Sequence, residues 1–141
     1  MQIKIKKLHP NAITPQYAKE GDAGMDLTAV SFEFMDTEHI KYNFGLAIEI
    51  PKGYVGLVFP RSSCYKQRQI LSNCVGVIDS GYRGEISAVM VVTSKERYER
   101  YKILDRVAQI IIMPYPEIEF VETDELSTSE RGEGGYGSTG K

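Results

Sequence analysis

A carboxylate, an amide and a phenol ring lie close together in residues 73–84. The amide of Asn73 carries donors and acceptors and could read the edge of a base. The carboxylate of Asp79 could hold and deprotonate a water molecule, and the ring of Tyr82 could pack against a sugar. Apolar residues precede Asp79 and glycines flank the segment, so we expect a tight hairpin with polar side chains at its mouth. From these residues alone, the alternative is a structural Asx-turn at Asp79.

Three shorter segments place polar side chains next to apolar runs. Residues 23–27 (Ala-Gly-Met-Asp-Leu) put the carboxylate of Asp26 in a strand-like setting. Residues 60–63 (Pro-Arg-Ser-Ser) bring a guanidinium and two hydroxyls to the start of an expected helix, an arrangement that binds phosphate. Residues 105–109 (Asp-Arg-Val-Ala-Gln) put polar groups at the entrance of a buried strand. Each segment alone is also compatible with a cap, a surface ion pair or a solvated strand entrance.

The last eleven residues, 131–141, differ from the rest of the chain because five of them are glycine. Glycine lets successive backbone N–H groups turn toward an anion. Arg131 adds a guanidinium, and Ser138 and Thr139 add hydroxyl donors. The ring of Tyr136 could cover a planar base. The segment cannot bury enough surface to order itself, so we expect a flexible C-terminal arm; the alternative is a solvated tail without function.

The composition excludes several function classes. A chain of 141 residues with 42% apolar and 26% charged residues is typical of one soluble globular domain. Its net charge of −2 offers no electrostatic footprint for nucleic acid or an anionic membrane. Two cysteines form no disulfide framework or zinc pattern, and no signal peptide or spanning segment is evident. We therefore expect a cytoplasmic protein that binds neither nucleic acid nor membrane.

The elements that must position these groups are mostly strands. Helix evidence is limited to residues 64–69, where a preceding serine could cap a short helix. Residues 95–102 carry charges and favour a hairpin tip. Many short strands with turns between them predict an all-β sandwich, jelly roll or barrel, which often hides its sheet edges by oligomerising. Apolar periodicity predicts strands around residues 3–5, 44–50, 54–59, 86–92, 107–113 and 118–121, with 86–92 and 107–113 buried on both faces.

The order and spacing of these segments resemble the five motifs of the trimeric dUTP pyrophosphatase (dUTPase) family. The motifs correspond to residues 23–27, 60–63, 73–84, 105–109 and 131–140. The resemblance implies a distorted all-β barrel or jelly roll with one short helix, comprising a domain over residues 1–130 and a flexible lid over 131–141. The chain departs from the family pattern at Ser63, where glycine is usual, at Gly81, where an acidic residue is common, at Leu104, where glycine is normal, and at Tyr136, where phenylalanine is usual.

The resemblance implies hydrolysis of dUTP to dUMP and pyrophosphate by water attack on the α-phosphorus, with Asp79 as the general base. It implies that a Mg²⁺ ion is held by the triphosphate and waters, with Asp26 as an outer-shell carboxylate. It also implies a homotrimer in which three subunits contribute to each active site. The other substrate-binding residues that it implies are Asn73, Gly76, Val77 and Ile78 for uracil, Tyr82 for deoxyribose, Arg61, Ser62, Ser63 and Gln109 for the phosphates, and Arg131, Tyr136, Gly137, Ser138 and Thr139 for the closing lid.

Two other functions share this fold. A dCTP deaminase would need an acid/base residue suited to the departure of an amine, and would not need the arginine, glycines and aromatic ring of the tail. A phage dUTPase that also acts as a protein-binding regulatory module is the second alternative, and it could coexist with catalysis. Pyrophosphate release from dUTP and ammonia release from dCTP distinguish the two enzymes.

Overall fold

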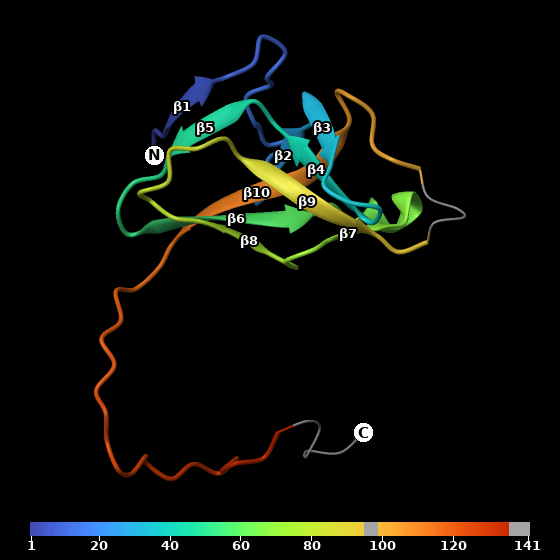
Figure 1. Cartoon of the computed structure of the whole chain (residues 1–141). Coiled ribbons are helices and arrows are strands. Elements are labelled where there is room, and N and C mark those ends of the chain that lie inside the picture. Colours follow the sequence, from blue (N-terminus) through green and yellow to red (C-terminus); the bar gives the residue numbers. More distant parts are fainter. Residues whose placement is uncertain (95–98, 136–141) are drawn as a thin grey trace.

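The computed structural model describes residues 1–94 and 99–135 of the chain. These residues form two four-stranded antiparallel sheets, a small two-stranded sheet and one short 3-10 helix (Figure 1). The strands are β1 (Lys4–Lys7), β2 (Met25–Thr28), β3 (Ser31–Phe34), β4 (His39–Asn43), β5 (Leu46–Glu49), β6 (Tyr54–Pro60), β7 (Gln69–Leu71), β8 (Gly76–Ile78), β9 (Ser87–Val92) and β10 (Arg106–Pro114), and the helix is η1 (Cys64–Gln67).

The first four-stranded sheet has the order β2-β10-β6-β8, and the second has the order β3-β4-β9-β7. In the first, β2 and β8 are the edge strands, and the nine-residue strand β10 pairs with both β2 and β6. β1 pairs only with β5, so the amino-terminal lysines lie on an edge, a common protection against unwanted strand pairing. The fold class expected from the sequence is confirmed.

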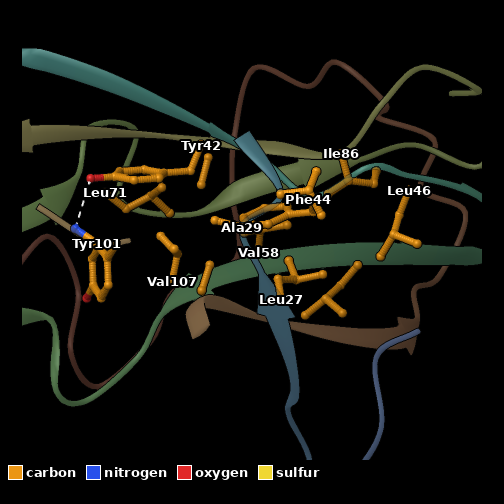
Figure 2. Close-up of a cluster of buried hydrophobic side chains, with 14 of the residues drawn as sticks. Leu27, Ala29, Tyr42, Phe44, Leu46, Val58, Leu71, Ile86, Tyr101 and Val107 are labelled. Carbon is orange, nitrogen blue, oxygen red and sulfur yellow. Dashed lines mark hydrogen bonds between the residues drawn. The ribbon is translucent and has the colours of Figure 1, made fainter. Parts of the chain in front are cut away.

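The core contains side chains from both four-stranded sheets, as Figure 2 shows for a cluster that includes Leu27, Tyr42, Phe44 and Val58. The expected apolar face of residues 44–50 is confirmed, because Phe44, Leu46, Ile48 and Ile50 are all buried. The strand itself is interrupted at Gly45, whose φ of +65° separates β4 from β5.

Burial of residues 86–92 on both faces is wrong. In β9, Ala88 and Met90 are buried while Val89 between them and Val91 after them are only half-buried, so the strand has one covered face. The strand expected at residues 118–121 is also wrong. From Tyr115 to Gly135 the described chain contains no helix or strand, and the side chains of Ile118 and Phe120 are 65% and 91% exposed. Their alternating pattern finds no sheet to join within this chain.

The short helix is a 3-10 helix that ends at Gln67, two residues earlier than expected. Arg68 adopts a left-handed conformation with a φ of +55° and ends the helix before Gln69 begins β7. The expected serine cap is wrong, because Ser63 occupies the N-cap position without a side-chain cap hydrogen bond.

Two expected hairpins are absent from the described chain. For the hairpin expected over residues 73–84, β8 pairs with β6, whereas the next strand, β9, pairs with β4 and β7 in the other sheet, so the turn after Asp79 does not join two paired strands. Similarly, β9 and β10 belong to different sheets, so the segment between them is a crossover; residues 95–98 of that segment lie outside the described residues. In the described part of the chain, no helix has the length and apolarity needed to cross a bilayer.

Candidate functional site

Asp26 lies at the centre of a cluster of charges. Its Oδ1 accepts a hydrogen bond from Nε of Arg61 at 2.7 Å, and its Oδ2 accepts one from Nη1 of Arg106 at 3.1 Å. Arg61 directly follows β6 and Arg106 begins β10, so the β2-β10-β6 order brings these residues together. Nη1 of Arg61 also lies within hydrogen-bonding distance of the Ser63 hydroxyl, at 3.4 Å. The two guanidinium groups carry more N–H donors than these bonds use, so they can bind an anion.

Gln109 lies beside this cluster. It pairs with Asp26 across β10 and β2, and its Nε2 donates to the carbonyl of Pro60 at 3.0 Å. An amide –NH₂ has two donors, so a second N–H is available for a ligand. Asp26, Arg61, Ser62, Arg106 and Gln109 line a cavity of about 430 Å³. Its size and its donors suit a polyphosphate.

Carboxylates are sparse in this cavity. Only Asp22 and Asp26 among the described lining residues carry one, and the described residues contain no group of three or more His, Cys, Asp or Glu side chains that could hold a metal ion. A divalent cation held mainly by ligand oxygens and waters fits this donor set. Asp26 would then accept hydrogen bonds from the bound waters, because each carboxylate oxygen can accept more than one hydrogen bond.

Asp79 belongs to a second cluster, at the β8 edge of the sheet. The first cluster, formed by Asp26, Arg61, Arg106 and Gln109, lies toward the β2 edge. Asp79 directly follows the edge strand β8, and a turn forms as the N–H of Tyr82 donates to the carbonyl of Asp79 at 3.1 Å. Its exposed carboxylate makes no hydrogen bond within the described residues, so the Asx-turn alternative is wrong. Asp79 and Val77 line a cavity of about 390 Å³ with Tyr54 and Tyr115.

The ring of Tyr82 is held against its own loop. Its hydroxyl donates to the carbonyl of Glu85 at 3.0 Å, and a Cβ at Gly84 would collide with that hydroxyl. Glu85 in turn accepts a hydrogen bond at Oε1 from the N–H of Gly45 at 2.7 Å. These contacts hold the Tyr82 ring against residues 84 and 85.

Asn73 lies near the start of β8. A Cβ at Gly76 would be 3.7 Å from Nδ2 of Asn73, so the amide is close to this edge strand. Among the described strands, β8 pairs only with β6, so its other edge has backbone groups that no described strand pairs. An amide next to unpaired N–H and C=O groups can recognise the polar edge of a base.

One chain cannot bring the two clusters together. Asp26 lies on β2, and Ile78, which precedes Asp79, lies on β8 three strand spacings away. Ile78 of β8 pairs with Gly56 of β6, which in turn pairs with Ile112 of β10. Ile112 lies three residues beyond Gln109, the β10 residue that pairs with Asp26. Standard strand geometry therefore separates them by about 14 Å across the sheet and roughly 10 Å along it. Neither side chain spans that distance, and within one chain the two clusters line separate cavities.

Arg131 is distant from both clusters in the sequence. It belongs to the segment that follows β10 and extends away from the sheets (Figure 1). Its Nε donates to the carbonyl of Gly134 at 2.9 Å. The other predicted residues of the lid, Tyr136, Gly137, Ser138 and Thr139, lie outside the described residues.

The sequence analysis included Arg106 and Gly24 in two of its segments but assigned neither residue a role. Arg106 stands three positions before Gln109 in the same short segment, and this proximity was the available signal. Gly24 stands two positions before Asp26. Only the three-dimensional packing shows that its missing side chain leaves space for the side chain of Gln109.

Known proteins resemble this chain over almost its full length. A family model described as dUTPase matches residues 10–140. The deoxyuridine 5'-triphosphate nucleotidohydrolase of Nautilia profundicola is 41% identical over 143 residues and is covered completely, as is this chain; that of Alkaliphilus metalliredigens is 39% identical over 98% of this chain and 96% of the relative. A solved structure of a mutant Staphylococcus bacteriophage 80alpha dUTPase with dUpNHpp superposes with a TM-score of 0.86 at 28% identity, covering 99% of both chains.

Proposed function

The chain belongs to the dUTPase family, and we propose that it hydrolyses dUTP to dUMP and pyrophosphate, with water attacking the α-phosphorus. Such an activity limits uracil incorporation into DNA and supplies dUMP for thymidylate synthesis. One observation carries the proposal at the level of the site. Asp26, Arg61, Ser62 and Gln109 come from three separate motifs, yet line one cavity suited to a triphosphate.

The phosphate chain is bound by the first cluster. Arg61, Ser62 and Gln109 donate hydrogen bonds to phosphate oxygens, and Ser63 helps to orient Arg61. Asp26 would accept hydrogen bonds from waters bound to a Mg²⁺ ion, and the ion would supply neutralisation of charge on the triphosphate. Asp26 also keeps both guanidinium groups in place through its two oxygens.

The second cluster binds the nucleoside and supplies the base. Asn73 and the backbone groups of Gly76, Val77 and Ile78 read uracil, and the narrow edge excludes the 5-methyl group of thymine and the amino group of cytosine. The ring of Tyr82 stacks on deoxyribose and leaves no room for a 2′-hydroxyl. Asp79 holds the attacking water and removes its proton, and its exposed carboxylate, free of hydrogen bonds within the described residues, supports this role.

We propose that the protein acts as a homotrimer with shared active sites. The separation between Asp26 and Asp79 supports this arrangement, because each site needs both clusters and one chain holds them at opposite edges of a sheet. Apolar side chains beyond β10 give further support. Ile118, Phe120, Val121 and Leu126 are at least 65% exposed, and a partner subunit would cover them.

Residues 131–141 form the proposed lid over a body that ends at residue 130. Arg131, Ser138 and Thr139 bind the terminal phosphate, Tyr136 covers uracil, and Gly137 permits the tight approach of the backbone. Because the lid closes only over a correctly bound nucleotide, it adds to specificity. Both cysteines are free, which supports a location in the reducing cytoplasm.

The test is an assay of dUTP, dCTP and UTP with Mg²⁺, in which pyrophosphate and ammonia are both measured. We expect pyrophosphate from dUTP and little turnover of dCTP or UTP. Ammonia from dCTP would instead identify a deaminase. Absence of both products would contradict the proposed hydrolase and favour a binding module. No feature of the described residues favours either alternative.

A further inference from the structure

We propose that Gly24 is a positioning residue for phosphate binding, because the space left by its missing side chain holds the Gln109 amide in the first cluster. This inference rests on the proposed function only in taking the ligand to be the triphosphate of dUTP. The contact between Gly24 and Gln109 is a property of the folded chain whatever the ligand.

The requirement at position 24 is one of space. The φ of Gly24 does not lie in the positive region, unlike the φ of Gly21 and Gly45, so the backbone there accepts any residue. A Cβ at position 24, however, would collide with Oε1 of Gln109 and lie 3.1 Å from its Cδ. The side-chain amide of Gln109 therefore occupies the volume that a methyl group at position 24 would fill.

The same amide is anchored on its other side. Nε2 of Gln109 donates to the carbonyl of Pro60, the residue immediately before Arg61. Gly24, which immediately precedes β2, and Pro60, the last residue of β6, thus confine the amide from two sides, and β10 supplies the side chain itself. This confinement directs the remaining N–H of Gln109 toward the cavity that it shares with Arg61 and Ser62.

An added methyl group at position 24 would act mainly on function. Both of its shortest contacts are with the far end of a flexible side chain, which can rotate away without a shift of the backbone. Rotation breaks the bond to Pro60 and moves the donor out of place. Gly45 is the opposite case: a Cβ there would be 2.7 Å from Cβ of His9 and 3.0 Å from Cγ2 of Val30, at a φ of +65°.

The experiment is a double-mutant cycle on dUTP hydrolysis with Gly24→Ala, Gln109→Ala and the double variant. We expect each single variant to raise KM roughly tenfold with little change in kcat, as expected for the loss of one hydrogen bond to a charged group in ground and transition states alike. In the Gln109→Ala background, Gly24→Ala should change KM less than about twofold, because the side chain that it displaces is already gone. Additive effects, near a hundredfold in total, would overturn the proposal, as would a Gly24→Ala enzyme with unchanged KM.

Two further measurements separate this inference from its alternatives. The thermal unfolding midpoint should stay near that of the wild type in Gly24→Ala and fall clearly in Gly45→Ala; a fall of similar size in both would mean that Gly24 has only a structural role. The side-chain ¹⁵N–¹H resonances of Gln109 should shift in ligand-free Gly24→Ala, and unshifted resonances would contradict the contact. If the wild type did not hydrolyse dUTP, the proposed function would fail, while these resonances would still decide whether Gly24 positions Gln109.

Discussion

Nε of Arg61 donates a hydrogen bond to Oδ1 of Asp26 over 2.7 Å, although 35 residues separate them in the chain. The pair is only about one-quarter exposed on each side chain, so it is held in a partly dehydrated setting where a charge-assisted bond is strong. The first cluster, which we propose binds the phosphates, is therefore organised within one chain. The cluster that carries Asp79 lies at the other edge of the same sheet.

Asp79→Asn should abolish turnover while nucleotide binding is retained. An amide cannot accept the proton of the attacking water, so kcat should fall by at least about a hundredfold. The dissociation constant of a non-hydrolysable dUTP analogue, measured by calorimetry, should change by less than about threefold, since the asparagine keeps the shape of the loop. Turnover equal to that of the wild type would remove Asp79 from its role.

Mixing two inactive variants should restore activity if each site combines two chains. Asp79→Asn lacks the base and Arg61→Ala lacks a phosphate ligand, so each homotrimer should be nearly inactive. When the two chains are refolded together in equal amounts, about a quarter of the sites should combine an intact Asp79 from an Arg61→Ala chain with an intact Arg61 from an Asp79→Asn chain. We expect close to that fraction of the wild-type rate. Activity no higher than the sum of the two separate variants would show that sites are not shared.

Ending the chain at Glu130 should leave a folded trimer with little activity. The strands and the apolar core precede this point, whereas Arg131 and the remaining predicted lid residues follow it. Light scattering and thermal unfolding should match the full chain, while kcat/KM for dUTP falls by roughly a hundredfold or more, as for loss of a closing lid. Full activity of the shortened chain would contradict the lid.

Removal of Mg²⁺ with a chelator should lower the rate and the affinity for the triphosphate together. The cavity of the first cluster presents two carboxylates, too few to bind the ion without help from triphosphate oxygens. Binding of dUMP, which lacks the β- and γ-phosphates, should depend much less on the ion and serves as the control. A rate that is indifferent to the chelator would argue against the role of Asp26 toward bound waters.

Tyr101→Phe and Tyr42→Phe should have opposite effects on stability. The Tyr101 hydroxyl is buried and has no hydrogen-bond partner within the described residues, so its removal should be neutral or stabilise the fold by up to about 1 kcal/mol. The Tyr42 hydroxyl donates to Oε1 of Gln69 at 3.1 Å and accepts from the N–H of Tyr101 at 3.2 Å. Its removal should cost about 1–3 kcal/mol of unfolding free energy, measured in urea.

The ionisation of Tyr101 gives a further test, at high pH. Burial raises the pKa of Tyr101 to about 12 from an ordinary value of 10.0, because the phenolate is poorly solvated inside the fold. The unfolded chain thus ionises this group first, so its contribution to stability is complete below pH 10 and is lost as the pH rises toward 12. Tyr101→Phe should therefore lose less stability than the wild type between those two pH values. Parallel pH profiles of the two proteins would contradict this assignment.

Much of the candidate site could be predicted from the sequence because the order and spacing of five short segments resemble those of a family. That resemblance, rather than any single segment, implied roles for Arg61, Ser62, Asp26 and Gln109, and the structure brings these residues to one cavity. Gly24 could not be selected this way. Its role depends on the position of Gln109, which lies 85 residues further along the chain.

Alternation of apolar residues by itself determined that the chain is built mostly from strands and that one face of residues 44–50 is buried, because the side-chain period of two is a local property. Only the tertiary structure decided which strands are neighbours. Backbone N–H and C=O groups are the same at every residue, so the sequence near β8 does not encode whether its partner is β7 or β6. For the same reason, the apolar residues at 118–121 have strand character without a strand, because they pair with no strand among the described residues.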